Sequence, residues 1–201
     1  PDDEGYHLDG GCAIGMRLAQ AGLRPLVLER SVPGAEASSA AAGILSAQLH
    51  QKPGPLFELG LESREAYADF AREITTLSGV DVGYVRCGMI SLGDRIAAYR
   101  WQLRRGLAVE ALDARALRSL EPALDKRHRG GLLFPAEAQI DSPKLARALS
   151  LAAGRAGCVF RGDVRVARIA HARGRVAGVD LEDGRISTRV VVLAAGAWSS
   201  L

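Results

Sequence analysis

The sequence contains few of the residues from which metal centres and disulfide frameworks are built. Its 201 residues include three cysteines and four histidines, all scattered along the chain. Neither the odd number of cysteines nor their spacing gives a disulfide framework or a metal-ligand pattern, so we expect no metal site and a reducing compartment. We expect Cys12, Cys87 and Cys158 each to be a small core residue.

Long apolar runs and strong charge are also absent. No stretch approaches the roughly 18 apolar residues of a membrane-spanning helix, and the acidic N-terminus is not a signal peptide. The net charge of +3 comes from arginines scattered through predicted helices and turns. Without aromatic interleaving or a recognised motif, these arginines predict no nucleic-acid partner. We therefore expect a cytoplasmic protein, of one or two domains, that binds neither membrane nor nucleic acid.

What the chain does contain is the second half of a dinucleotide-binding βαβ unit. A glycine-rich run at residues 10–15 leads into a helical segment, a short apolar strand at 23–28 and then Glu29. In such units the glycines let the backbone approach a pyrophosphate at a helix N-terminus. The acid that ends the second strand accepts hydrogen bonds from the ribose hydroxyls.

Two registers fit the glycines. Read as G-x-G-x-x-G, residues 10–15 place Cys12 at the middle glycine and leave a helix of about two turns. With Gly11 as the last glycine, the helix runs from about 12 to 22, and Glu29 follows at close to the usual spacing of about 20 residues. We adopt the second register. Residues 1–9 should then form the first strand, yet they lack the apolar run that a buried parallel strand needs.

The remaining chain predicts an alternation of helices and strands. Residues 37–47 are rich in small side chains and predict a helix start with a tight approach around Gly43. Helices are expected at 55–78, 94–105, 114–119 and 141–156. Strands are expected at 80–92, 131–134, 158–160, 164–170, 176–181 and 185–193, with a hairpin turn at Asp183-Gly184.

This order predicts an α/β fold. A Rossmann-like nucleotide-binding domain with a mostly parallel sheet and a terminal β-meander is expected in residues 1–79 and 141–201. An α+β substrate domain, of which residues 80–140 form part, interrupts it.

Two further stretches make the nucleotide-binding signal specific. One is Ser38-Ser39-Ala40-Ala41-Ala42-Gly43-Ile44-Leu45, about ten residues after Glu29, and the other is VVVLAAGAWS at 190–199. With SGVDV at 78–82 and RCGM at 86–89, they resemble FAD-dependent amine oxidases of the D-amino-acid oxidase superfamily, within it the glycine oxidases of thiamine biosynthesis. The resemblance covers about residues 10–201, roughly half of such an enzyme. It implies that the FAD-binding domain here is incomplete.

The resemblance implies a cofactor-binding role for several residues. Gly10 and Gly11 would face the pyrophosphate, and Glu29 the ribose, with Arg30 bordering the adenosine. The alternative for Glu29 is a solvent-exposed acid at a strand end. Ser38 and Ser39 would bind pyrophosphate oxygens, or only cap a helix.

The other implied contacts are made by small residues and by backbone. Ala42, Gly43 and Ile44 would lie along the flavin ring, or else allow close helix packing. The main chain of Val164 would contact adenine, unless Val164 is an ordinary core residue. Ala195 and Gly196 would pack beside the cofactor, or form only a tight turn.

The implied function is an FAD-dependent oxidoreductase. It would oxidise glycine or another small amino acid to the imine and then the oxo acid, and reduce O₂ to hydrogen peroxide. The alternatives are an amino-acid dehydrogenase that passes electrons to a quinone, and a truncated non-catalytic fragment. A homo-oligomer is left open.

No catalytic residue is assigned. In the family, the arginine that clamps the substrate carboxylate comes from the C-terminal half. Arg86, Arg64 and Arg72 are assigned instead to a solvated face. We expect residues 1–201 alone to bind FAD weakly or not at all, and to be inactive.

Overall fold

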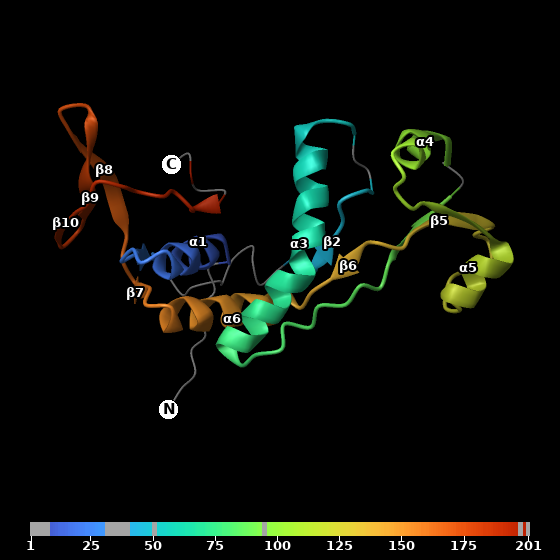
Figure 1. Ribbon diagram of the computed structural model, residues 1–201, viewed down its shortest axis with the longest axis horizontal. Helices are drawn as coiled ribbons and strands as arrows, with labels where there is room; N and C mark the ends of the chain where they lie inside the picture. Colours follow the sequence, from blue (N-terminus) through green and yellow to red (C-terminus); the bar gives the residue numbers. More distant parts are fainter. Residues whose placement is uncertain (1–8, 31–40, 50–51, 94–95, 197–198, 200–201) are drawn as a thin grey trace. The chain divides into compact units, whose positions relative to one another are not determined.

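The computed structural model describes residues 9–30, 41–49, 52–93, 96–196 and 199, which form a mixed α/β structure (Figure 1). They cluster into two compact units. The first unit contains the described residues up to Ala42, Arg72–Val82, and those from Ser142 onward. The second contains Gly43–Ala71 and Gly83–Asp141.

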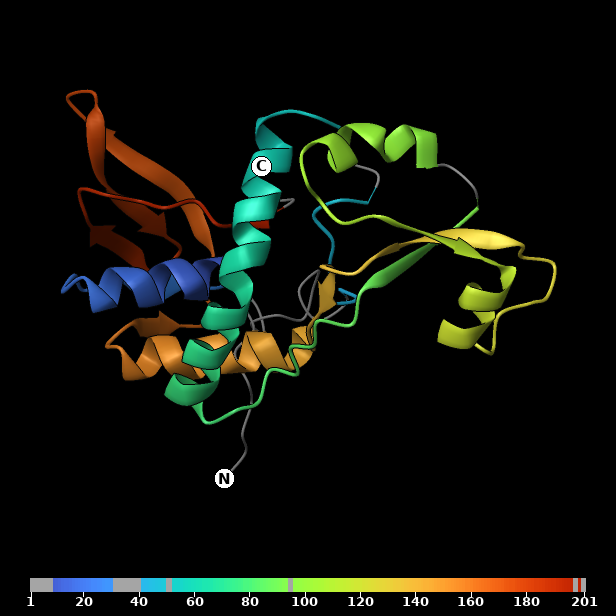
Figure 2. The same ribbon diagram turned by 45° about the vertical axis from the view of Figure 1, so that its right-hand side comes forward.

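The helices and strands of the first unit surround two packed helices. Helix α1 (Asp9–Gln20) packs on α6 (Ser142–Arg155), and the two lie side by side in both views (Figure 1, Figure 2). Strand β1 (Leu26–Leu28) pairs in parallel with β7 (Val159–Arg161). The terminal meander is antiparallel, in the order β10-β9-β8, and comprises β8 (Val166–Ala172), β9 (Arg175–Leu181) and β10 (Gly184–Ser187).

Small side chains bring these helices together. Cys12 and Met16 of α1 are fully buried, as are Ala146 and Ala152 of α6. The Cys12 thiol lies 3.6 Å from the Ser150 hydroxyl. Because alanines leave the α6 backbone close to its neighbour, α1 fills the remaining space with two sulfur-containing side chains.

Gly15 sets the distance between α1 and the parallel strands. A Cβ atom at this position would lie 3.0 Å from Sγ of Cys158 and 3.3 Å from Cγ2 of Val27. Cys158 is buried and Val27 is half-buried, so a side chain at position 15 would force these neighbours or the helix to shift. Burial also raises the pKa of the Cys158 thiol, which favours its neutral form here.

The second unit is built on an antiparallel sheet with strand order β3-β5-β4. Its strands are β3 (Met89–Leu92), β4 (Glu110–Asp113) and β5 (Gly130–Phe134); its short helices are α4 (Ile96–Arg104) and α5 (Ala114–Leu120). A core cluster of Tyr99, Val109, Leu132 and Phe134 joins α4 to the sheet. Separately, β2 (Ile44–Leu45) pairs antiparallel with β6 (Ala138–Gln139).

Helix α3 (Pro55–Ser78) belongs to the second unit up to Ala71 and to the first from Arg72. Residues 43–71 therefore cluster with the second unit, whereas the sequence analysis placed them with 1–79. The pairing of β2 with β6 explains this grouping, because it ties Ile44 and Leu45 to Gln139 and Ala138.

The helices agree with the sequence analysis better than the strands do. Helix α1 spans 12 residues and holds Gly10 and Gly11 in its first turn, which favours the second register over a two-turn helix. The strand expected at 80–92 is reduced to β3 and an isolated bridge between Val85 and Gln139. The left-handed φ angles of Gly83 and Gly88, +63° and +71°, interrupt it.

Three other expectations are wrong. Of the helix start expected at 37–47, the described part, from Ala41, is extended and then forms β2. The strand expected at 185–193 ends at Ser187, because the Thr188 hydroxyl accepts a hydrogen bond from the N–H of Val190 and so replaces a strand partner. Cys87 is exposed rather than buried, since it lies in the irregular segment before Gly88.

We predict that Gly15→Val lowers the free energy of unfolding by about 1–3 kcal/mol, because the added side chain overpacks the α1–strand contact. Gly154→Val is the matched control: Gly154 also lies in a helix, but no described atom would lie within 4 Å of its Cβ. The control should change stability by no more than about 0.5 kcal/mol in urea denaturation. Equal losses in the two variants would show that helix propensity, and not packing, sets the effect.

Asp180 gives a second prediction. Its carboxylate accepts hydrogen bonds from Arg185 and Arg168, which lower its pKa from 3.8 to about 2. Because the folded-state pKa is the lower one, the ionised carboxylate stabilises the meander above pH 3.8, and this contribution is lost as the pH falls from 3.8 to about 2. An NMR titration of the Asp180 carboxyl carbon should report a midpoint near 2, and a midpoint near 3.8 would show that the ion pairs do not form.

Candidate nucleotide-binding site

The N-terminus of α1 has the properties of an anion site. The first N–H groups of a helix have no partner within the helix, and the helix dipole places partial positive charge there. Gly10 is exposed in this first turn, and a Cβ atom at its position would meet no described atom within 4 Å. A phosphate can therefore approach the backbone at Gly10 closely. The pyrophosphate role of Gly10 and Gly11 remains a proposal.

Glu29 follows β1 and is held by backbone hydrogen bonds on both sides. Its N–H donates to the carbonyl of Arg161 (3.1 Å), and its own carbonyl accepts from the N–H of Val164 (2.8 Å). Since a tight turn at 21–25 reverses the chain between α1 and β1, the carboxyl end of β1 lies at the edge where α1 begins. The half-buried Glu29 side chain and the glycines of α1 are thus placed at one edge of the first unit.

The structure brings two of the expected adenosine residues together. Val164 is half-buried and its N–H bonds to Glu29, so it is not an ordinary core valine. The preceding residue, Asp163, has a left-handed φ of +53°, which turns the chain out of β7 toward the Glu29 carbonyl. Arg30 is exposed next to Glu29.

The residues expected along the flavin ring lead into β2 and are not part of a helix. Gly43 has a φ of +73°, and its carbonyl accepts a hydrogen bond from the N–H of Ile140 (2.8 Å). Ala42 is exposed, and the Ile44 side chain is 61% exposed although its backbone pairs with Gln139. Ser38 and Ser39 lie outside the described residues.

Ala195 and Gly196 lie in an exposed turn of the first unit. Gly196 has a φ of +54°, and its carbonyl accepts from the N–H of Ser199 (3.1 Å). The described contacts therefore support the tight-turn interpretation. Packing of this turn beside a cofactor remains a proposal.

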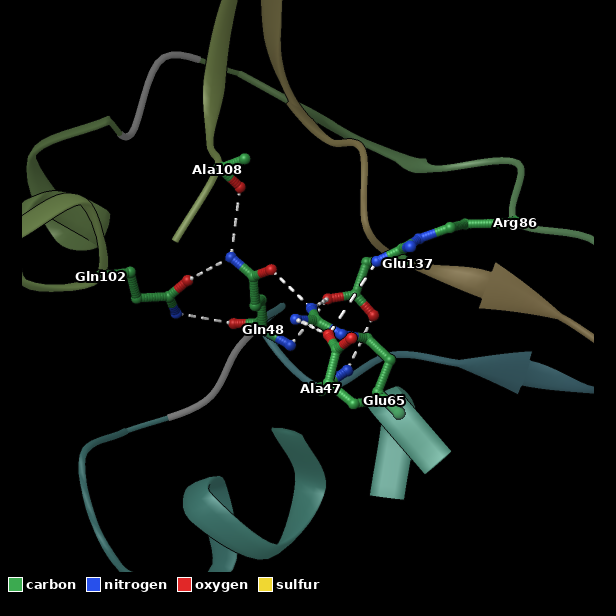
Figure 3. Close-up of polar contacts among 8 residues, drawn as sticks. Ala47, Gln48, Glu65, Arg86, Gln102, Ala108 and Glu137 are labelled. Atoms are coloured by element: carbon green, nitrogen blue, oxygen red, sulfur yellow. Dashed lines mark hydrogen bonds and ion pairs between the residues drawn. The ribbon is translucent and has the colours of Figure 1, made fainter. Parts of the chain in front are cut away.

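A group of buried polar side chains in the second unit was not predicted from the sequence. We call Gln48, Arg64, Gln102 and Glu137 the Glu137 cluster; each is at most 8% exposed. Figure 3 shows Gln48 between Gln102 and Glu137, and their polar atoms converge. The guanidinium of Arg64 donates to Oε1 of Gln48 (2.6 Å) and lies 3.4 Å from Oε1 of Glu137.

The solvated face assigned to Arg64 is therefore wrong, whereas Arg86 and Arg72 are exposed as expected. The buried positions of α3 are Phe57, Arg64, Ala71, Ile74 and Ser78, spaced seven, seven, three and four residues apart. The neighbouring helix positions Leu59 and Ser63 are exposed. A heptad count from Phe57 would have placed Arg64 among the buried residues.

The chain matches a family of flavin-dependent oxidoreductases. The family model for DAO, described as FAD dependent oxidoreductase, matches residues 10–201, so the chain belongs to this family, whose cofactor is FAD. This confirms the resemblance and the α/β fold drawn from the sequence. None of the helices in the described parts of the chain is long and apolar enough to cross a membrane.

Within the family, the chain is similar to glycine oxidases. It is 33% identical to the glycine oxidase of Geobacillus kaustophilus over 204 residues, which cover 94% of this chain and 52% of that protein. It is 32% identical to the bifunctional protein ThiO/ThiG of Synechocystis over 194 residues, covering 93% of this chain and 28% of that one. The chain thus spans about half the length of the glycine oxidase that it matches.

The chain is also similar to solved structures of glycine oxidases. The glycine oxidase structure from Geobacillus kaustophilus superposes with a TM-score of 0.88 at 32% identity, covering 97% of this chain and 54% of that one. The glycine oxidase from Bacillus cereus gives 0.87 at 28% identity, covering 97% and 56%.

We predict that Arg64→Met lowers the free energy of unfolding by about 3–5 kcal/mol, because it leaves the Glu137 carboxylate buried without its cation. Arg161→Met is the control, since it removes the arginine of an exposed pair with Asp183, whose side chains are 43% and 63% exposed. That control should lose at most about 1 kcal/mol in the same urea titration. Similar losses of unfolding free energy in both variants would mean that the protein's stability depends on the buried Arg64 no more than on the exposed Arg161.

Proposed function

We propose that the chain forms the FAD-binding part of an oxidase that acts on glycine or another small amino acid. Residues 1–79 and 141–201 would hold FAD, and residues 80–140 would form part of the substrate domain. The similarity to glycine oxidases supports the substrate class. The observation that carries the cofactor assignment is the hydrogen bond between Val164 and Glu29 at the carboxyl end of β1.

The described residues fit FAD. Glu29 can accept the ribose hydroxyls, the backbone at Val164 can border adenine, and the first turn of α1 can bind the pyrophosphate. In the second unit, the hydroxyl of Ser46 is buried and has no hydrogen-bond partner among the described residues. It follows β2 directly, so a polar group of a bound molecule would satisfy it.

The net reaction proposed converts glycine, O₂ and water into glyoxylate, ammonia and hydrogen peroxide. Bound FAD supplies the two-electron acceptor for this oxidation. The residues of this chain bind and orient: Glu29 and the α1 N-terminus fix the adenosine diphosphate portion, and Gly43 and Ile44 offer a close backbone surface to the ring. No proton transfer is assigned to a residue of this chain.

We predict that Glu29→Ala, made in a full-length version of the protein, weakens FAD binding by about 1–3 kcal/mol, through loss of charge-assisted hydrogen bonds to the ribose. Glu182→Ala is the matched control, because Glu182 is an exposed glutamate in the turn between β9 and β10 of the same unit. Titration of each variant with FAD, followed by quenching of flavin fluorescence, gives the two dissociation constants. An unchanged constant for Glu29→Ala would argue against the ribose role.

The reaction itself is tested with glycine as the amine. An oxidase consumes O₂ and releases hydrogen peroxide in step with glycine, whereas turnover only with an added quinone would identify a dehydrogenase.

A further inference from the structure

The segment Gly43–Gln48 is tied along its length to residues 137–140. At one end the Gly43 carbonyl accepts from Ile140 (2.8 Å), and in the middle Ile44 and Leu45 pair with Gln139 and Ala138. At the other end the N–H groups of Ala47 and Gln48 donate to the Glu137 carboxylate, at 2.8 and 2.9 Å. Backbone hydrogen bonds and the Glu137 carboxylate together therefore fix the conformation of this segment, which forms β2 and then bends at residues 47–48.

The Glu137 carboxylate can act as this anchor only because its charge is compensated. Glu137 is fully buried, and an isolated buried carboxylate would be strongly disfavoured. Two consecutive N–H groups supply partial positive charge to its oxygens, and the Arg64 guanidinium, 3.4 Å away, supplies a full one.

The side chain of Gln48 extends the anchor into the rest of the second unit. Its amide nitrogen donates to Oε1 of Gln102 (3.0 Å) and to the carbonyl of Ala108 (3.2 Å) (Figure 3). The Gln102 amide donates in return to the Gln48 carbonyl (2.9 Å). Because Gln48 is hydrogen-bonded through both its backbone and its side chain, it has little freedom to move.

The segment remains accessible although it is rigid. Ile44 is 61% exposed, and the buried Ser46 hydroxyl and Nε of Arg64 have no hydrogen-bond partner among the described residues. The second unit therefore combines a fixed backbone with two buried polar atoms that a polar group of a bound molecule could satisfy.

We propose that Glu137 and Arg64 are positioning residues for the flavin. They hold Gly43–Gln48 in its bound conformation before FAD arrives, so that no ordering of this segment opposes binding. The inference rests on the proposed function, in which Gly43 and Ile44 lie along the ring. Neither Glu137 nor Arg64 touches the reacting atoms.

The test compares Glu137→Gln with the wild type, both in a full-length version of the protein. The amide retains one acceptor but turns an NH₂ group toward the second backbone N–H, so amide exchange at Ala47 and Gln48 should accelerate without FAD. We expect the FAD dissociation constant to rise about ten- to a hundredfold, and the visible absorption of bound flavin to shift. Glu137→Asp keeps the charge but shortens the reach, and it should show smaller changes of the same kind if Glu137→Gln does not fold.

Glu58→Gln is the matched control, because Glu58 forms an exposed ion pair with Arg105 in the same unit. It should leave both exchange at 43–48 and flavin binding unchanged. Faster exchange in Glu137→Gln or Glu137→Asp with an unaltered flavin constant and spectrum would overturn the positioning role and leave the proposed function standing. A full-length wild-type protein that takes up no FAD even at saturating concentration would contradict the proposed function, and this inference with it.

Discussion

The second unit depends on one buried carboxylate. Without Glu137, the N–H groups of Ala47 and Gln48 would lose their acceptors, and Arg64 would lose its buried anion and keep only the exposed Glu65, 3.2 Å away. The Arg64 guanidinium, which donates to Gln48, would then be less firmly held. Such networks specify a single arrangement of the chain because every alternative leaves a polar group unsatisfied.

The first unit is held by a different constraint, which is steric. Helix α1 approaches α6 through alanines and approaches the parallel strands through Gly15, so its position follows from the absence of side chains. An ion pair adds to this at the surface, where Arg17 binds Glu73 with both nitrogens, at 2.6 and 2.7 Å. This geometry raises the pKa of Arg17 and lowers that of Glu73. Packing fixes the position of α1. The exposed ion pair adds little stability and mainly sets how α1 is oriented toward the C-terminal end of α3.

The sequence predicted the helices well because their apolar periodicity is local. α3 and α6 begin and end within about one residue of the expected positions, as capping and proline signals allow. Strand lengths could not be predicted in the same way. At 80–92 the strand is interrupted by the dihedral angles of two glycines. At 188–193 it is ended by a threonine hydroxyl that accepts a hydrogen bond from a backbone N–H. Of the site, the roles of Glu29 and Val164 could be proposed from motifs, but their hydrogen bond could not. The Glu137 cluster joins residues from distant parts of the chain, and no spacing rule connects them.

The bond between Val164 and Glu29 is made entirely by backbone atoms. The separation between the acid at the end of β1 and the start of the meander is therefore independent of the side chain at position 164. Residues of many sizes can occupy that position without moving Glu29, provided that they carry an amide hydrogen. Proline, which has none, is the residue that this site excludes on chemical grounds. Position 164 should therefore tolerate side chains of different volume and exclude the residue that lacks an amide hydrogen.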